Sequence, residues 1–189
     1  MKRILLAGVL AGLAMYIWSS VAHIALPLGT VGLQQIPNEQ AVLTSMSGSL
    51  SQSGLYFFPF MLPGTSMQQQ VEKLKTSPSG LLIYHPAGAP GMTMAMLGTE
   101  LLTEIVVSIL AVWLLSKTRI ASFGGRVGFV TVVGLTAAIM TNVQYWNWYG
   151  FPLSYTASYM FTQLVGFLVA GLVAAKMINT GEAAMARGA

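Results

Sequence analysis

The chain has 189 residues, of which 54% are hydrophobic and only 7% are charged. Soluble domains carry about one quarter charged residues, so this composition excludes an ordinary soluble protein and indicates a membrane protein. The net charge of +4 comes from scattered basic residues, which form no patch for nucleic acid. Because the chain has no cysteine, a disulfide framework, a thiolate zinc site and a redox pair are excluded.

Four apolar segments are long enough to cross a hydrocarbon core of about 30 Å, which takes about 20 helical residues. We expect these spans at residues 4–26, 92–116, 123–143 and 151–175. The sequence therefore predicts an all-α membrane protein, a four-transmembrane-helix bundle with a small mixed α/β extracytoplasmic cap. The expected domains are transmembrane helix 1, the cap, transmembrane helices 2 to 4 and a cytoplasmic tail, at residues 1–26, 27–91, 92–178 and 179–189.

The basic residues predict the orientation of these spans. In a four-span arrangement most of them fall on one side: Lys2, Arg3, Lys117, Arg119, Arg126, Lys176 and Arg187. Lysine and arginine are enriched in cytoplasmic loops, so we expect both termini in the cytoplasm. A competing interpretation treats residues 1–22 as a secretory signal, with a basic start and small residues at its cleavage site.

The expected cap carries signals of local order. Asn38 precedes an apolar-periodic segment and predicts a short helix whose first free amides donate to the asparagine side chain. Residues 54–59 and 80–86 are apolar runs bounded by Gly and Pro, which predict short strands. The polar residues 66–75 between them predict a helix, so a strand, helix, strand crossover would pair the two runs. Alternatively each run lies flat on the membrane surface, because residues 57–62 are as apolar as a membrane anchor.

Two carboxylates, Glu100 and Glu104, lie one helical turn apart near the start of the second span. By helical rise they lie roughly 8 and 14 Å below its outer end, where a carboxylate is paired, protonated or functional. No basic residue is expected at that depth. We therefore expect protonated or solvated glutamates in a polar pocket open to the outside, with Glu104 bonded to Gln163 or Tyr159. The predicted cluster comprises His23, Glu100, Glu104, Asn142, Tyr159 and Gln163. The alternative is a protruding helix with both acids at the headgroup level.

Small residues recur at four-residue spacing in the spans, which lets helix backbones approach closely. The predicted packing positions are Gly8, Gly12, Gly134, Gly166 and Gly171. Packing within the chain is one interpretation, and contacts with partner helices are the other. Four aromatic residues lie near the outer end of the third span: Tyr145, Trp146, Trp148 and Tyr149. Such a set is typical of an interfacial belt, and the alternative is a platform for a ligand or partner.

Cofactor and catalytic signatures are weak or missing in the sequence. His23 and His85 could face each other across the outer surface and hold haem, a pigment or a metal, but two imidazoles without a fixed spacing are poor support. We therefore expect no cofactor and no metal. The chain contains no Asp, which excludes a Ser-His-Asp triad, and no Gly-rich phosphate loop. Nothing in the sequence supports an enzyme.

Three stretches carry a resemblance: residues 18–43, GLYFFP at 54–59, and residues 126–152 ending in YWNWYGFP. They resemble an uncharacterised family of small bacterial four-span membrane proteins. The resemblance implies the four-span fold over nearly the whole chain and a location in a bacterial inner membrane, and it brings no established activity. Two functions remain. One is a non-catalytic accessory or scaffold subunit that lies in the lipid bilayer and packs against other membrane subunits or self-associates. The other is a small transport or ligand-binding bundle in which Glu100 and Glu104 handle protons or cations.

Overall fold

The computed structural model describes residues 1–179 and is 68% helical. It divides into a helical unit, made of residues 1–33, 92–147 and the chain from 151 onward, and a hairpin unit, made of residues 34–91 and 148–150. Apart from Asn179, the predicted cytoplasmic tail lies outside the described residues.

Four long helices form the helical unit, although the last two residues of α5 belong to the hairpin unit. They are α1 (Lys2–Ser20), which continues through a π-helical turn at Val21–Ala25, α4 (Met94–Leu115), α5 (Phe123–Tyr149) and α6 (Leu153–Met177). Each is long and apolar enough to cross a membrane, as predicted. The largest difference from the predicted bounds is at the end of α5. The predicted span ends at residue 143, whereas the aromatic residues that follow continue the helix to Tyr149, just before Gly150. Gly150 has a φ of 69°, a left-handed conformation that glycine adopts without strain.

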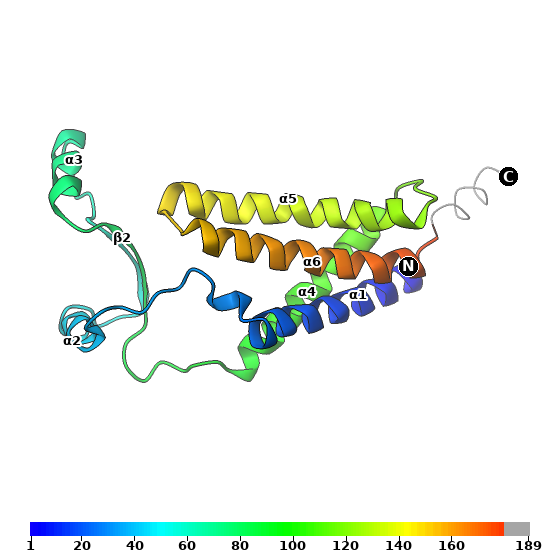
Figure 1. Cartoon of the computed structure of the whole chain (residues 1–189), viewed down its shortest axis with the longest axis horizontal. Coiled ribbons are helices and arrows are strands. Elements are labelled where there is room, and N and C mark those ends of the chain that lie inside the picture. The colour runs from blue at the N-terminus through cyan, green and yellow to red at the C-terminus, as the bar shows by residue number, and fades with distance from the viewer. Residues whose placement is uncertain (180–189) are drawn as a thin grey trace. The chain divides into compact units, whose positions relative to one another are not determined.

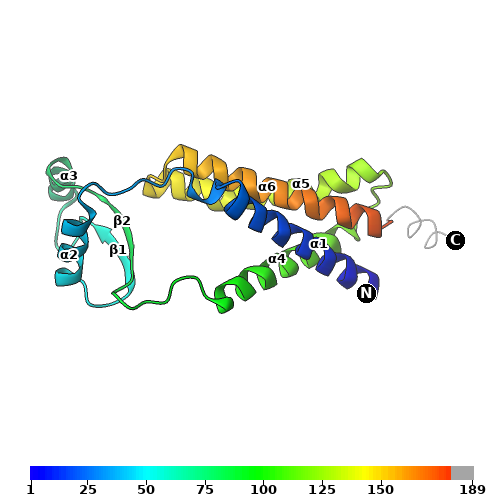
Figure 2. The same cartoon turned by 60° about the horizontal axis from the view of Figure 1, so that its bottom comes forward.

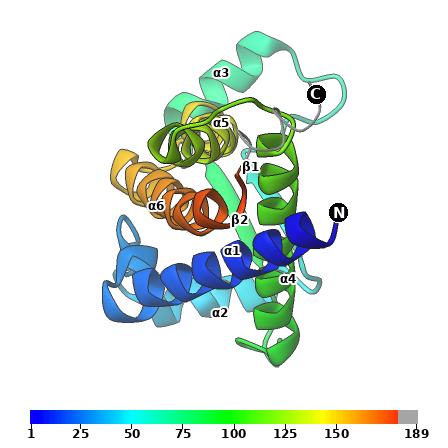
Figure 3. The same ribbon diagram turned by 90° about the vertical axis from the view of Figure 1, so that its right-hand side faces the viewer.

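The helix α1 lies between α4 and α6 and packs against both. Figure 2 shows α1 and α4 crossing, and Figure 3 shows the same crossing from the end of the helices. The helices α5 and α6 run side by side in opposite directions (Figures 1 and 2). Many of the buried contact residues are small: Ala7, Ala11, Ala111, Ala170 and Ala174. Small side chains let the helix axes approach closely, so these contacts position the polar residues of neighbouring helices against one another.

Two arginines from other helices bind the carboxyl-terminal end of α6. The Nε of Arg3 on α1 donates to the Met177 carbonyl at 2.6 Å. Arg126 on α5 is 8% exposed and donates to the Ala175 carbonyl from Nε and Nη2, at 3.3 and 3.1 Å. The last carbonyls of a helix lack donors within the helix, and positive charge is favourable there. These bonds therefore hold the first turns of α1 and α5 against the last turn of α6. We call this end of the helical unit, which carries Arg3 and Arg126, its basic end.

The hairpin unit contains the two predicted strands, β1 (Gly54–Phe58) and β2 (Gly80–Tyr84). They pair in antiparallel register, with Leu55 opposite Ile83 and Phe57 opposite Leu81. The predicted small sheet is therefore confirmed, but the expected crossover is wrong, because a crossover joins parallel strands. The contact of either run with a membrane surface stays a prediction. Two helices complete the unit, α2 (Glu39–Ser49) before β1 and α3 (Met67–Thr76) between the strands.

The two short helices begin differently. Asn38 precedes α2 as expected, but its predicted capping hydrogen bond is wrong: Asn38 has a φ of 52°, outside the β region in which a capping side chain reaches the free amides. In α3, by contrast, the Ser66 hydroxyl accepts from the Gln69 amide at 3.2 Å, and the Gln69 side chain accepts from the Ser66 amide at 2.9 Å. This reciprocal pair forms a capping box, which fixes the first turn of α3.

Candidate functional site: the polar residues at the end of α1

Glu104 is the central residue of the candidate site. It lies on the stripe of α4 that is buried in the helical unit, one to three turns before Ser108, Ala111 and Leu115. Its side chain is 5% exposed, and Oε1 accepts a hydrogen bond from the hydroxyl of Ser19 on α1. Among the described residues, no group donates to Oε2, which is buried. Burying a carboxyl oxygen without a partner is costly, so this atom is the least satisfied polar group of the helical unit.

The two predicted carboxylates have different surroundings. Glu100, one turn nearer the start of α4, is exposed, whereas Glu104 is enclosed. The alternative in which neither acid is buried is wrong for Glu104, and the depth of either acid in a membrane stays a prediction. Within residues 1–179 neither glutamate has an ion-pair partner, because the one ion pair there joins Glu72 and Lys75. A buried carboxyl without a cation must be balanced by hydrogen bonds or by a proton.

His23 occupies the π-helical turn that follows α1. Its Nδ1 lies 2.8 Å from the Ser19 carbonyl oxygen. A carbonyl only accepts, so Nδ1 donates this hydrogen bond. The imidazole packs edge-on to Tyr159 of α6, with ring centroids 6.0 Å apart. Ser19 therefore connects the two titratable groups, because its hydroxyl bonds Glu104 and its carbonyl bonds His23.

Asn142 and Gln163 form a separate contact between α5 and α6. The amide of Asn142 donates to Gln163 Oε1 at 2.8 Å and to the Ala138 carbonyl at 2.9 Å. The predicted bond from Glu104 to Gln163 or Tyr159 is therefore wrong, and Ser19 takes that place. The predicted cluster is divided into three contacts. They join Glu104 to Ser19, His23 to Tyr159, and Asn142 to Gln163. Ser19 was missed, although its position one turn before His23 on a predicted span was a usable signal.

The predicted small residues all lie against another helix of the same chain. A Cβ built on Gly8 or Gly12 would lie 2.6 or 2.5 Å from a backbone Cα of α4. A Cβ on Gly134 would overlap the Phe167 ring of α6, and those on Gly166 and Gly171 would lie 3.2 and 3.1 Å from atoms of α1 and α5. Gly8, Gly12 and Gly171 all face backbone atoms of another helix, and the closest of these approaches are those of Gly8 and Gly12 to α4. The position of Glu104 beside α1 therefore depends on these two glycines.

The aromatic residues at the end of α5 are exposed, most of all Trp148 at 73%. Trp146, Tyr145 and Tyr149 are each about half exposed. The Tyr145 ring contacts Phe151 at 5.3 Å, which begins a series of ring contacts along α6 through Tyr155 and Tyr159 to His23.

The chemistry available at this site is narrow. Within residues 1–179, no three His, Asp or Glu side chains come together to hold a metal. His85 belongs to the hairpin unit, where its Nδ1 lies 3.4 Å from the Ser53 hydroxyl. One carboxyl, one hydroxyl and one imidazole can bind and release a proton. No family model, curated protein or solved structure matches the chain.

Proposed function

We propose that the protein is a non-catalytic, multi-pass membrane subunit that works by associating with another membrane protein or with further copies of itself. Exposed apolar side chains along the four long helices support the membrane part of this proposal, among them Val132 at 59% and Leu110 at 55%. Lipid tails would cover them. The basic end of the helical unit, with Arg3 and Arg126, would then face the cytoplasm of a bacterium, and both termini would lie there.

The observation that carries the association is the sparse core of the hairpin unit. Of its residues 34–91, only Pro59, Gln70 and Tyr84 are buried. A domain of about 60 residues normally buries about 60% of the surface of its unfolded chain. One face of the sheet meanwhile exposes the opposed pair Leu55 and Ile83, at 67% and 68%. Exposed apolar surface of this kind marks an interaction site, so a protein partner would stabilise the unit by covering the sheet face.

The test is the assembly state of the full chain purified in mild detergent. We expect a complex with a stoichiometric membrane partner or a homo-oligomer. Changing Leu55 and Ile83 to Lys places two charges on the sheet face and should release the monomer. Gln68→Lys, at another exposed position of the hairpin unit, should assemble like the parent. A fully stable monomer, or assembly that ignores the sheet-face charges, would argue against the proposal.

A second candidate function is proton or cation transport through the helical unit, and the buried, unpartnered Oε2 of Glu104 favours it. Carboxylates at this depth in a membrane commonly relay protons. In vesicles holding a pH-sensitive dye, Glu104→Gln should abolish proton uptake while leaving the fold intact. Glu39→Gln, an exposed change on α2, should not alter uptake. Equal rates for the parent, Glu104→Gln and empty vesicles would remove this candidate.

A further inference from the structure

We infer that α3 lies flat on the outer surface of a lipid bilayer, with one apolar stripe in the boundary between headgroups and tails. The inference rests on the membrane part of the proposed function. The stripe consists of Met67, Val71 and Leu74, spaced by four and three residues. Residues at this spacing share one helix face. They are 68%, 44% and 43% exposed, so the hairpin unit covers the stripe only in part.

The burial of α3 is the reverse of a helix packed on a protein core. The side chain that α3 buries is polar: Gln70 is 7% exposed and donates from Nε2 to the Pro59 carbonyl at 2.9 Å. The hydrophobic effect would normally turn the apolar stripe inward and leave a glutamine outside. Here a polar contact holds the helix, and the apolar stripe is free for an external apolar phase.

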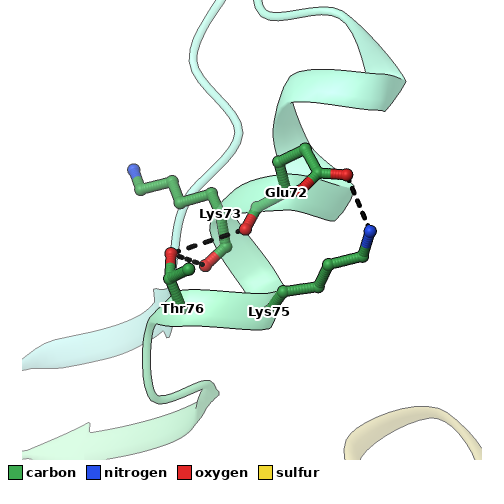
Figure 4. A network of polar contacts seen from close by, with 4 residues as sticks. All are labelled: Glu72, Lys73, Lys75 and Thr76. Carbon is green, nitrogen blue, oxygen red and sulfur yellow. Dashed lines mark hydrogen bonds and ion pairs between the residues drawn. The ribbon is translucent and has the colours of Figure 1, made fainter.

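The polar side of α3 fits an orientation parallel to a membrane. Figure 4 shows the ion pair of Glu72 and Lys75, 2.7 Å apart, and the Thr76 hydroxyl near the carbonyls of Glu72 and Lys73. At about 100° per residue, Lys75 and Lys73 lie roughly 75° and 125° from the centre of the stripe, on its two sides. Lys75 is held by Glu72 near the border of the stripe, which leaves Lys73, on the polar side, as the basic side chain of α3 that can reach lipid phosphates. This charge pattern favours a phospholipid surface over an apolar protein groove.

Chain connectivity keeps α3 within reach of a bilayer. The strand β2 ends at Tyr84 and α4 begins at Met94, so the connector between them spans at most about 35 Å. A ten-residue helix binds lipid weakly alone, but a short tether gives it a high effective concentration at the surface. Phe60 and Leu62, each 62% exposed just before α3, add apolar surface to the same segment.

Spin labels on single cysteines test the inference, because the native chain has no cysteine to remove. The full chain is reconstituted in vesicles of phosphatidylcholine with a minority of phosphatidylglycerol. Labels replace Val71 and Leu74 on the stripe, Thr76 on the opposite face, and Leu110 on the exposed side of α4 as a reference for the bilayer. Relaxation by oxygen, which concentrates in lipid, is compared with relaxation by a water-soluble nickel chelate.

We expect the ratio of oxygen to nickel relaxation at Val71 and Leu74 to exceed the ratio at Thr76 several-fold. The docking of α3 would be overturned if nickel relaxed the label at Val71 as strongly as the label at Thr76 while oxygen dominated the relaxation at Leu110. That result would leave the membrane proposal standing. Labels at Val71 and Leu74 shielded from both reagents would also overturn it, because a protein would then cover the stripe. Nickel access at Leu110 would instead refute the membrane proposal itself.

Discussion

Replacing Gly12 with Ala tests the close approach of α1 and α4. The added Cβ would lie 2.5 Å from the Ile105 Cα, 2.8 Å from the Ile105 amide nitrogen and 2.9 Å from the Glu104 carbonyl oxygen. All three atoms are backbone, so no side chain can rotate to make room. Reaching an ordinary contact of 3.4 Å from 2.5 Å requires the two helices to separate by about 0.9 Å. Overpacking of this kind costs about 1–3 kcal/mol.

Gly128→Ala on α5 is the matched control, because a Cβ there meets nothing within 4 Å. Both changes gain about 1 kcal/mol of helix propensity, so the difference between the two variants isolates the overpacking cost. Unfolding in mixed micelles, followed by circular dichroism, should show Gly12→Ala less stable than Gly128→Ala by about 1–3 kcal/mol. Equal stability of the two variants would refute the backbone contact between α1 and α4.

The remaining predictions concern neighbouring contacts of the same unit. Gly166→Ala should cost less than Gly12→Ala, because its Cβ would meet a flexible methionine side chain at 3.2 Å, and the same unfolding assay ranks the two. Glu104→Ala should lower the stability by about 1–3 kcal/mol because the Ser19 hydroxyl loses its acceptor, whereas Glu104→Gln keeps an acceptor and should stay near the parent. A double-mutant cycle with Ser19→Ala that shows no coupling would contradict this contact. Arg126→Met should destabilise the protein by about 1–3 kcal/mol because it leaves the Ala175 carbonyl without its donors, while exposed Arg119→Met should have little effect in thermal unfolding.

Hydropathy predicted the four long helices well, because length and apolarity alone decide whether a helix can cross a bilayer. It failed at the end of α5. Gln144, Tyr145 and Asn147 lower the mean hydropathy, yet they continue the helix because its backbone bonds do not depend on side-chain polarity. The strands of the hairpin unit were predicted from their flanking Gly and Pro. Their antiparallel register was not, because long-range pairing is set by the whole segment between them.

The candidate site could be predicted only in part. Depth along a helix identified the region of Glu104, but depth carries no information about rotation around the helix axis or about which helices are neighbours. For this reason the sequence did not separate exposed Glu100 from buried Glu104, and it did not find Ser19. Arg126 was read only as a sign of orientation. Its role depends on the Ala175 carbonyl, 49 residues further along the chain, which local patterns cannot connect.

The proposed association is tested most directly by the mass of the complexes that contain this chain. They are ejected from native membranes straight into a mass spectrometer. Detergent extraction is avoided, so weak contacts of the hairpin unit survive. We predict species heavier than one chain by a defined partner or by whole copies, and their loss when Leu55 and Ile83 are both changed to Lys. The mass of a single chain with bound lipid as the only species would contradict the central claim.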